Sequence, residues 1–224
     1  MHLAAKGLTV RFQGRPALDG VSLDLPPGTQ VLVLGPSGAG KTVLLKSLAG
    51  LVPQARTAVL WDGGPAGGER QSAFGMVFQG DALFDSSSVR ENVEYPLLRR
   101  GAAPDEAAAR AWEALEEVGL EGAADQLPET LSGGMRKRAG LARALVARPR
   151  VLLLDDPLAG LDPITAFGVA ELVRRASEGR TLVVAAPEPP PQLRLGRWIW
   201  MGRGRVLHDG PPAPAPVMDA GDLA

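Results

Sequence analysis

Three short apolar runs stand out along the chain, at residues 31–34, 151–154 and 181–185. Each is bounded on at least one side by Gly, Pro or Arg, and unbroken apolar runs of this length are typical of parallel strands buried on both faces. Two N-terminal segments, 8–12 and 21–25, instead alternate apolar and polar residues with a period of two. That alternation predicts an antiparallel sheet with one exposed face.

Two helices are predicted from apolar residues at helical spacing. Pro104 suits the first position of a helix, and Gly119 can end that helix in a left-handed conformation. The apolar residues between them are Ala108, Ala111, Trp112, Leu115 and Val118. A second helix is predicted between Ser132 and Pro149, with one apolar face formed by Met135, Ala139, Ala142, Leu145 and Val146. Strands separated by helices predict an α/β fold.

The order of these elements predicts three parts. We expect a discontinuous α/β core over residues 1–84 and 144–210, which includes the antiparallel β subdomain at the N-terminus. A helical subdomain over residues 85–143 is inserted into it. The last part, residues 211–224, is rich in Pro. Because Pro has no amide hydrogen to donate, the segment from Gly210 to Pro216 is expected to stay outside a sheet, as an extended or disordered terminus.

The composition excludes several classes of function. The chain has 224 residues, no Cys and two His, at positions 2 and 208. A thiolate or multi-histidine zinc site is therefore impossible, and a nucleophile–histidine pair is not expected. The net charge is −1, so no nucleic-acid partner is expected. The sequence lacks a signal peptide and any apolar run of the roughly 18 residues needed to span a bilayer, so we expect a soluble cytoplasmic protein.

A glycine-rich segment follows the first apolar run directly. It consists of Gly35, Pro36, Ser37, Gly38, Ala39, Gly40, Lys41 and Thr42, and an apolar helix begins with Val43. Glycines allow successive backbone N–H groups to surround phosphate oxygens, and the helix N-terminus adds its dipole. Lys41 then reaches the β and γ phosphates, and Thr42 offers its hydroxyl to Mg²⁺. We therefore predict a phosphate-binding loop (P-loop), with Gly35 to Val43 as nucleotide-binding residues.

A P-loop also needs a carboxylate to hold the magnesium ion. The second apolar run ends at Asp155, and we expect it to form the strand next to the strand that precedes the P-loop. An apolar run that ends in Asp is common and is usually only a strand end. Together with the P-loop, it predicts a magnesium site at Asp155.

Further motifs occur in the order typical of ATP-binding cassette (ABC) ATPases. The segment Leu131, Ser132, Gly133 and Gly134, continued by residues 135–138, resembles the signature motif of that family. Phe12 is similar to the aromatic residue that stacks on adenine. Gln79 is similar to the Q-loop glutamine that senses Mg²⁺ and the γ-phosphate, and Asp162 belongs to a segment that resembles the D-loop. On local sequence alone, Phe12 could instead be a core residue and Gln79 an ordinary strand-end residue.

The resemblance covers about residues 3–210 and implies a P-loop NTPase (RecA-like) core. It also implies that two cassettes, identical or different, sandwich two ATP molecules, so that each P-loop faces Ser132 of the other chain. The implied cofactors are ATP and Mg²⁺, with Thr42, Gln79 and Asp155 at the metal. A monomer is then expected to bind nucleotide but to hydrolyse it poorly.

A cassette of this size most resembles the ATPase subunit of a transporter, docked on a separate permease at the cytoplasmic face of the inner membrane. Residues 79–86, 89–97 and 135–138 are similar to those of the ATPases of Mla/Mce-type phospholipid transporters, which were linked to organic-solvent tolerance. The permease is expected to dock near residues 80–97, against exposed Leu83 and Phe84. The alternative is that these two residues pack inside the helical subdomain.

Two positions depart from the family pattern. The family has a catalytic Glu where this chain has Asp156, whose carboxylate is one methylene shorter. A misplacement of about 1 Å in such a site can cost on the order of 10²-fold in rate. The family's switch His is also missing, because the chain continues as Ala185, Ala186 and Pro187 after the third apolar run. We therefore expect ATP binding with slow hydrolysis, with Asp156 and Gln79 as the catalytic residues.

Three functions are compatible with these departures. The chain could be a transporter ATPase that still turns over with Asp156 as a weak base. It could be a degenerate cassette that binds ATP and pairs with a competent one. It could also be a nucleotide-gated structural or regulatory module without turnover.

Overall fold

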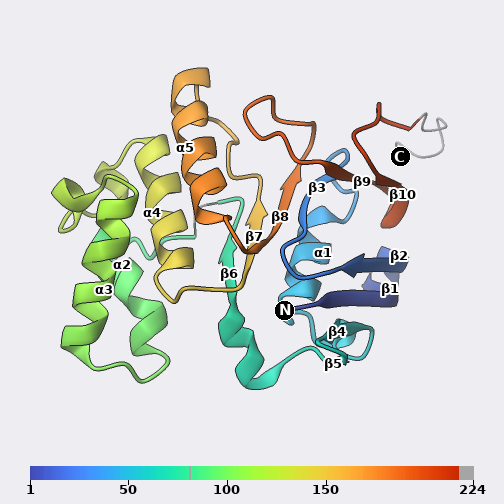
Figure 1. Cartoon of the computed structure of the whole chain (residues 1–224), viewed down its shortest axis with the longest axis horizontal. Coiled ribbons are helices and arrows are strands. Elements are labelled where there is room, and N and C mark those ends of the chain that lie inside the picture. The colour runs from blue at the N-terminus through green and yellow to red at the C-terminus, as the bar shows by residue number, and fades with distance from the viewer. Residues whose placement is uncertain (81, 217–224) are drawn as a thin grey trace.

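Two β-sheets form the framework of the protein in the computed structural model, which describes residues 1–80 and 82–216 (Figure 1). The first sheet is antiparallel, in the order β2-β1-β4-β5. Its strands are β1 (Leu3–Phe12), β2 (Arg15–Leu25), β4 (Val59–Trp61) and β5 (Gly64–Pro65). The second sheet has the order β10-β9-β3-β8-β7-β6 and is parallel except for β10, which runs antiparallel to β9.

The strands of the second sheet are β3 (Gln30–Leu34), β6 (Phe74–Val77), β7 (Val151–Asp155), β8 (Thr181–Ala186), β9 (Arg197–Gly202) and β10 (Arg205–Gly210). Every residue of β7 and β8 is buried. Apolar side chains therefore cover both faces of the sheet at its centre, as the unbroken apolar runs require.

Helices cover both faces of this central sheet. The helices are α1 (Lys41–Leu48), α2 (Val89–Leu98), α3 (Pro104–Glu117), α4 (Gly133–Leu145) and α5 (Pro163–Ala176). Helix α1 lies between the two sheets, where one apolar cluster joins Leu3 of β1, Leu44 of α1 and Val183 of β8. A second cluster, on the opposite face, joins Leu32 of β3 to Leu141 of α4 and Val173 of α5.

Helices α2 and α3 form a third apolar cluster with α4, to one side of the sheets (Figure 1). Ser88 and Glu91 begin α2 with a capping box, and Pro104 is the first residue of α3. Helix α4 belongs to two clusters, because Ala139 and Ala142 face the helices whereas Leu141 and Leu145 face the sheet. This helix therefore connects the helical part of the molecule mechanically to the central sheet.

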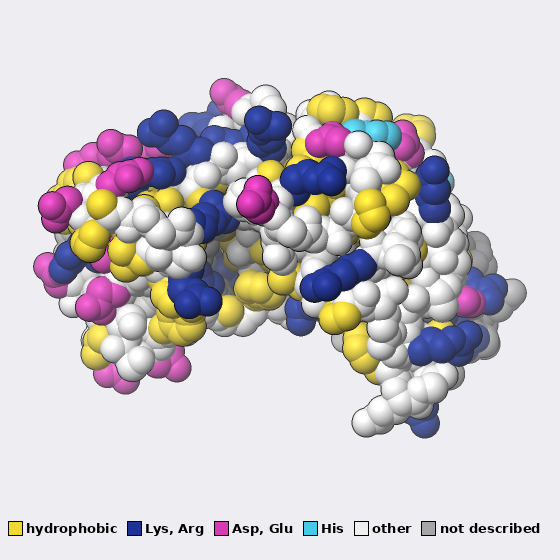
Figure 2. Space-filling view, turned by 90° about the horizontal axis from the view of Figure 1, so that it is seen from below, with side chains coloured by type: hydrophobic (Ala, Val, Ile, Leu, Met, Phe, Trp, Pro, Cys, Tyr) yellow, Lys and Arg dark blue, Asp and Glu magenta, His cyan; other side chains and the backbone are white. Residues whose placement is uncertain are grey.

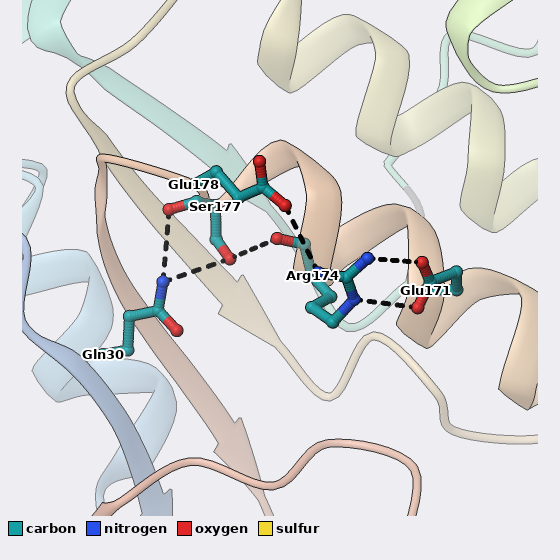
Figure 3. Close-up of polar contacts among 5 residues, drawn as sticks. All are labelled: Gln30, Glu171, Arg174, Ser177 and Glu178. Carbon is teal, nitrogen blue, oxygen red and sulfur yellow. Dashed lines mark hydrogen bonds and ion pairs between the residues drawn. The ribbon is translucent and has the colours of Figure 1, made fainter.

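The end of α5 is fixed to the start of β3 by polar contacts (Figure 3). The amide of Gln30 donates to the carbonyl of Ser177 at 3.2 Å, and within α5 Arg174 bonds Glu171 at 2.7 and 2.9 Å. Arg174 also contacts Glu178 at 3.2 Å. The ion pairs are exposed, and such pairs contribute little stability individually. The contact between Gln30 and Ser177 joins the end of α5 to the strand that leads to the P-loop.

The three buried strands, the α/β class and the two main helices confirm the sequence predictions. One topological prediction is wrong, because β8 lies between β3 and β7, so the strand that ends at Asp155 is not next to the P-loop strand. Trp112 was expected on the buried face of its helix, but it is 45% exposed and its indole donates to Glu116. Gly210 was expected outside the sheets, but it is the last residue of β10, paired with Trp198.

The Pro-rich segment that follows is described as far as Pro216, and the rest of the tail lies outside the described residues. Residues 211–216 belong to no helix or strand, as predicted, and the indole of Trp200 donates to the carbonyl of Ala213 at 3.1 Å. Among the described helices, none has the length and apolar character needed to cross a membrane.

Candidate nucleotide site

The P-loop adopts a shape that only glycine permits at two of its positions. Gly35 and Gly40 have φ values of 145° and 99°. A Cβ on Gly35 would collide with the carbonyl oxygen of Met201, and one on Gly40 would lie 2.5 Å from the carbonyl oxygen of Ala17. Side chains at these positions are therefore excluded both by backbone conformation and by lack of space.

The turn between β9 and β10 braces the P-loop from outside. The amide of Gly204 donates to the carbonyl of Ala39 at 3.0 Å, and the amide of Asp19 donates to the carbonyl of Gly204 at 2.9 Å. Arg205 reinforces the junction through an ion pair with Asp19 at 2.6 Å. Three segments far apart in the sequence thus fix the loop. The sequence motifs contain no signal for this brace beyond a glycine at a hairpin turn.

Lys41 is the first residue of α1 and lies over the P-loop. Its ammonium donates to the carbonyls of Gly35 at 2.6 Å and Pro36 at 2.9 Å. Burial lowers the pKa of Lys41, and the carboxylates of Asp155 and Asp156 oppose that shift. The ammonium is therefore half-buried and close to anionic groups, which suits a residue that binds phosphate.

A cleft of about 330 Å³ brings most of the predicted site residues together. It is lined by Ala17, Ser37, Gly38, Ala39, Gly40, Lys41, Thr42, Val43, Gln79, Asp155, Asp156 and Pro187. The cleft thus joins the P-loop to the ends of β6, β7 and β8. The sequence motifs did not indicate Ala17 or Pro187 as lining residues.

Asp155 has the properties of a magnesium-binding carboxylate. It is 3% exposed, and its Oδ2 has no hydrogen-bond partner among the described residues. A buried carboxylate oxygen without a partner is costly, so it indicates an interaction that the protein chain alone does not supply. The Thr42 hydroxyl and the Gln79 amide line the same cleft. Hydroxyl, amide and carboxylate oxygens are the ligands that Mg²⁺ prefers, so these residues fit the ion.

Asp156 lies beside Asp155 in a strained backbone conformation, with φ at 51°. Its amide donates to the carbonyl of Ala185 in β8 at 2.9 Å. Burial raises the pKa of Asp156; Lys137 opposes this rise, Asp155 adds to it, and Lys41 again opposes it. The backbone therefore places Asp156 at the cleft, where burial is the main cause of the raised pKa and the nearby charges act in both directions.

The remaining predicted residues lie outside this cleft. Phe12, at the end of β1, is 51% exposed, so the alternative that it is a core residue is wrong. Ser132 is exposed and caps α4, where its Oγ accepts from the amide of Met135 at 3.2 Å. Asp162 caps α5 in the same way and accepts from the amides of Ile164 and Thr165.

The signature segment is packed against the start of α5. A Cβ on Gly134 would collide with Cγ2 of Thr165, whereas Gly133 has space around it and Leu131 is buried among the helices. The hydrogen bond that Thr165 gives Asp162 lowers the pKa of that carboxyl. The signature and D-loop segments thus form one contiguous region of the surface, separate from the P-loop cleft of the same chain.

A second cleft, of about 270 Å³, opens between β6, α2 and α4. Aromatic and basic side chains line it, and Figure 2 shows hydrophobic and basic side chains gathered around a hollow on the lower face of the molecule. Phe84 and Tyr95 meet edge to face in its wall, with ring centroids 4.8 Å apart. The prediction that Leu83 is exposed is wrong, because it packs partly buried on the helical cluster, whereas Phe84 is 43% exposed.

Asn92 fixes the chain that leads into this second cleft. It is fully buried, its Oδ1 accepts from the amide of Phe84 at 2.7 Å, and the two hydrogens of its Nδ2 are shared among the carbonyls of Phe84, Ser87 and Ser88. One side chain therefore contacts four backbone groups of an otherwise irregular segment. Phe84 is held at the rim of the cleft by that network.

The parallel sheet, the glycine loop and the buried carboxylate define a P-loop nucleotide-binding protein. The family description "ABC transporter" matches residues 18–159, which is more than half of the chain. The chain therefore belongs to the ABC transporter family and is an ATP-binding subunit of that family.

Curated relatives and solved structures agree with this assignment. The L-cystine transport system ATP-binding protein TcyN of Escherichia coli K12 is 37% identical over 223 residues, which cover 93% of this chain and 89% of TcyN. The Fe(3+) ions import ATP-binding protein FbpC of Streptomyces avermitilis is 39% identical over 217 residues. That alignment covers 95% of this chain but 63% of FbpC.

Among solved structures, the ATP-binding cassette MJ0796 is similar in its dimeric, post-hydrolysis state with ADP and Pi bound. The TM-score is 0.81, the sequence identity is 29%, and the match covers 93% of this chain and 98% of that cassette. The similarity therefore extends over nearly the whole fold.

The brace on the P-loop can be tested at Gly204. A Cβ there would lie 2.7 Å from the carbonyl oxygen of Ala17, so Gly204→Ala must displace the turn from the loop. We expect ATP to bind about 10-fold more weakly, which corresponds to about 1.4 kcal/mol. Isothermal titration calorimetry with Mg-ATP measures this.

The matched control is Gly28→Ala. Gly28 has a similar φ of 80°, but no atom lies within 4 Å of the added Cβ. It carries the same backbone penalty of about 1 kcal/mol and leaves the loop in place. If Gly204→Ala and Gly28→Ala bind ATP with equal affinity, the turn at Gly204 does not hold the P-loop in its binding conformation.

Proposed function

We propose that this chain is a nucleotide-driven clamp, in which its own cleft holds Mg-ATP and a second cassette closes over the γ-phosphate. The observation that carries the proposal is the buried Oδ2 of Asp155, which has no partner among the described residues and lies in the cleft that Lys41 and Thr42 line. Gly35 to Val43 bind the phosphates, Asp155, Thr42 and Gln79 contact Mg²⁺, and Phe12 stacks on adenine.

The exposure of the remaining motif residues supports a role for a second cassette. Ser132 is exposed and begins α4, and the N-terminus of a helix favours an anion. It lies outside the chain's own cleft, so it is available to the nucleotide of another chain. Asp162 lies in the same surface region and crosses to the partner. The partner is either an identical chain or a different cassette.

We further propose that hydrolysis is slow. Asp156 reaches less far than the Glu of the family. The family places an imidazole at the position of Ala186, beside Pro187, which lines the cleft. Neither alanine nor proline has a side-chain donor, so neither side chain can hydrogen-bond the γ-phosphate. The residues predicted to bind Mg-ATP have the side chains that this binding needs. Positions 156 and 186 lack the Glu and the His that assist hydrolysis in the family.

Restoring the two positions tests this proposal. We expect Asp156→Glu to raise the rate of hydrolysis by up to about 10²-fold, since it corrects a misplacement of about 1 Å. Ala186→His or Pro187→His should raise the rate further. The family resemblance assigns position 186, where Ala186 is 4% exposed, whereas position 187 is the one that lines the cleft. Phosphate release from the purified complex with its permease gives the rates.

Lys41→Ala is the negative control, and it should lose ATP binding in every background. Turnover at a normal transporter rate in the unchanged protein, with no gain from any variant, would show that Asp156 is a competent base. Unchanged ATP binding in Lys41→Ala would overturn the P-loop assignment itself.

A second candidate is a degenerate cassette that pairs with a competent one. The combination of an altered Asp156 with an unaltered Ser132 favours it, because such a chain could still activate the nucleotide of its partner. If a mixture with a second cassette hydrolyses ATP while the chain alone does not, the heterodimer is the working form. A regulatory module without turnover would stay inactive in both assays.

We propose that a permease docks in the second cleft, near residues 80–97. An aromatic rim at Phe84 and Tyr95 suits the apolar face of a short helix, and the contacts of Asn92 hold that rim in place. This attachment would hold the subunit at the cytoplasmic face of the inner membrane.

The docking proposal is tested with Phe84→Ala. We expect recovery of the permease on the tagged cassette to fall about 10-fold, while ATP affinity stays unchanged. Phe167→Ala is the control, since Phe167 is 66% exposed on α5 and does not line the cleft. Equal recovery with both variants would place the permease elsewhere.

The cargo that we propose is a phospholipid or a related lipid. This rests on the resemblance of residues 79–86, 89–97 and 135–138 to the Mla/Mce-type ATPases, while the relatives named above transport cystine and iron(III). We expect phospholipid to co-purify with the intact transporter and to be released by Mg-ATP, as measured by mass spectrometry of the extract. Release of an amino acid or an iron chelate instead would overturn the lipid assignment.

A further inference from the structure

Lys137 is a buried lysine in residues 135–138, the continuation of the signature segment, and the sequence motifs assign it no role. It lies in the second turn of α4, and its side chain is 7% exposed. Lysine is rarely buried to this degree unless its ammonium is paired. The Nζ of Lys137 donates to the backbone carbonyl of Gln79 at 3.1 Å. The ammonium is therefore directed at the Q-loop and not at solvent.

The charge of Lys137 also acts on the second catalytic position. It opposes the rise in the pKa of Asp156 that burial causes. The other charged groups that act on Asp156 are Lys41 at the start of α1 and Asp155 at the end of β7. Lys137 is the charged residue of α4 that acts on the pKa of Asp156. One side chain thus contacts the Q-loop and influences the carboxylate of the same nucleotide cleft.

The helix that carries Lys137 begins at the signature. Ser132 caps α4, and the close packing of Gly134 on Thr165 fixes the start of this helix to α5. A displacement of Gln79 that keeps this hydrogen bond is therefore taken up by the Lys137 side chain or by the start of α4, which carries the signature. Since packed elements shift as rigid units, the contact between Gln79 and Lys137 can transmit a change between the two regions.

We propose that Lys137 is a positioning residue that couples the chain's own ATP site to the signature that acts on the partner's ATP. This rests on the proposed function, in which Gln79 responds to bound Mg-ATP and Ser132 meets the nucleotide of the second cassette. When Gln79 moves toward its nucleotide, the Lys137 ammonium carries that movement into α4. Nucleotide binding at either site then changes the affinity of the other site for nucleotide.

The test compares Lys137→Met with Lys137→Arg in the full-length chain. Met has a similar length but neither charge nor donor, whereas Arg keeps both. With Mg-ATP, we expect Lys137→Met to keep its monomer ATP affinity within about twofold. Its ATP-driven dimerisation, measured by sedimentation velocity, should weaken by at least 10-fold. The Hill coefficient for ATP in the Lys137→Met dimer should fall to 1. Lys137→Arg should dimerise with ATP, and bind it cooperatively, as the unchanged chain does.

Lys46→Met is the matched control. Lys46 is another partly buried lysine near the Q-loop, and its Nζ lies 6.0 Å from the centroid of the Phe78 ring without a bond to Gln79. It should dimerise as the unchanged chain does. If Lys137→Met lowers the melting temperature below that of the assay, Lys137→Gln replaces it, since Gln keeps a donor and loses the charge.

The outcomes separate this inference from the proposed function. If the unchanged chain fails to bind ATP or to dimerise with it, or with a second cassette, the proposed function fails. If the unchanged chain dimerises cooperatively and Lys137→Met does the same, the coupling role of Lys137 is wrong. Equal losses in Lys137→Met and Lys46→Met, or no restoration by Lys137→Arg, would also overturn it.

Discussion

The close approach of three backbone segments at the P-loop is the constraint on which the rest of the structure depends. Gly35 and Gly40 have no room for a Cβ because the carbonyls of Met201 and Ala17 occupy that space. Only glycine therefore fits at both positions, because β9 and β2 pack directly against the loop. Much of the two-sheet arrangement can be understood as the scaffold that brings these segments together.

The same scaffold concentrates charge in a small volume. Two carboxylates, Asp155 and Asp156, share the cleft with the ammonium of Lys41 and are approached by Lys137 from α4. Partial burial makes these charges interact more strongly than they would in water. A polyanion and a divalent cation would complete this balance, because one would bring negative charge to Lys41 and the other would satisfy the buried oxygen of Asp155.

Sequence reasoning succeeded where the chemistry is local. The P-loop, the strand that ends at Asp155 and the helix after Ser132 are each encoded by contiguous residues, and the structure has all three elements. It failed where the answer depends on spatial order. Apolar runs do not encode which strands are neighbours, so the position of β8 between β3 and β7 was missed. Helical periodicity likewise predicted a buried Trp112, whereas its side chain is exposed and its indole donates a hydrogen bond to Glu116.

The brace on the P-loop has a consequence for how the protein is made. Residues 35–42 leave the ribosome well before the hairpin that holds the loop, around Gly204. Domains generally fold as units during synthesis. The braced form of the P-loop therefore cannot form on the nascent chain before that hairpin has been synthesised. Its formation requires β2 and the β9–β10 turn, which are distant in sequence, to have come together.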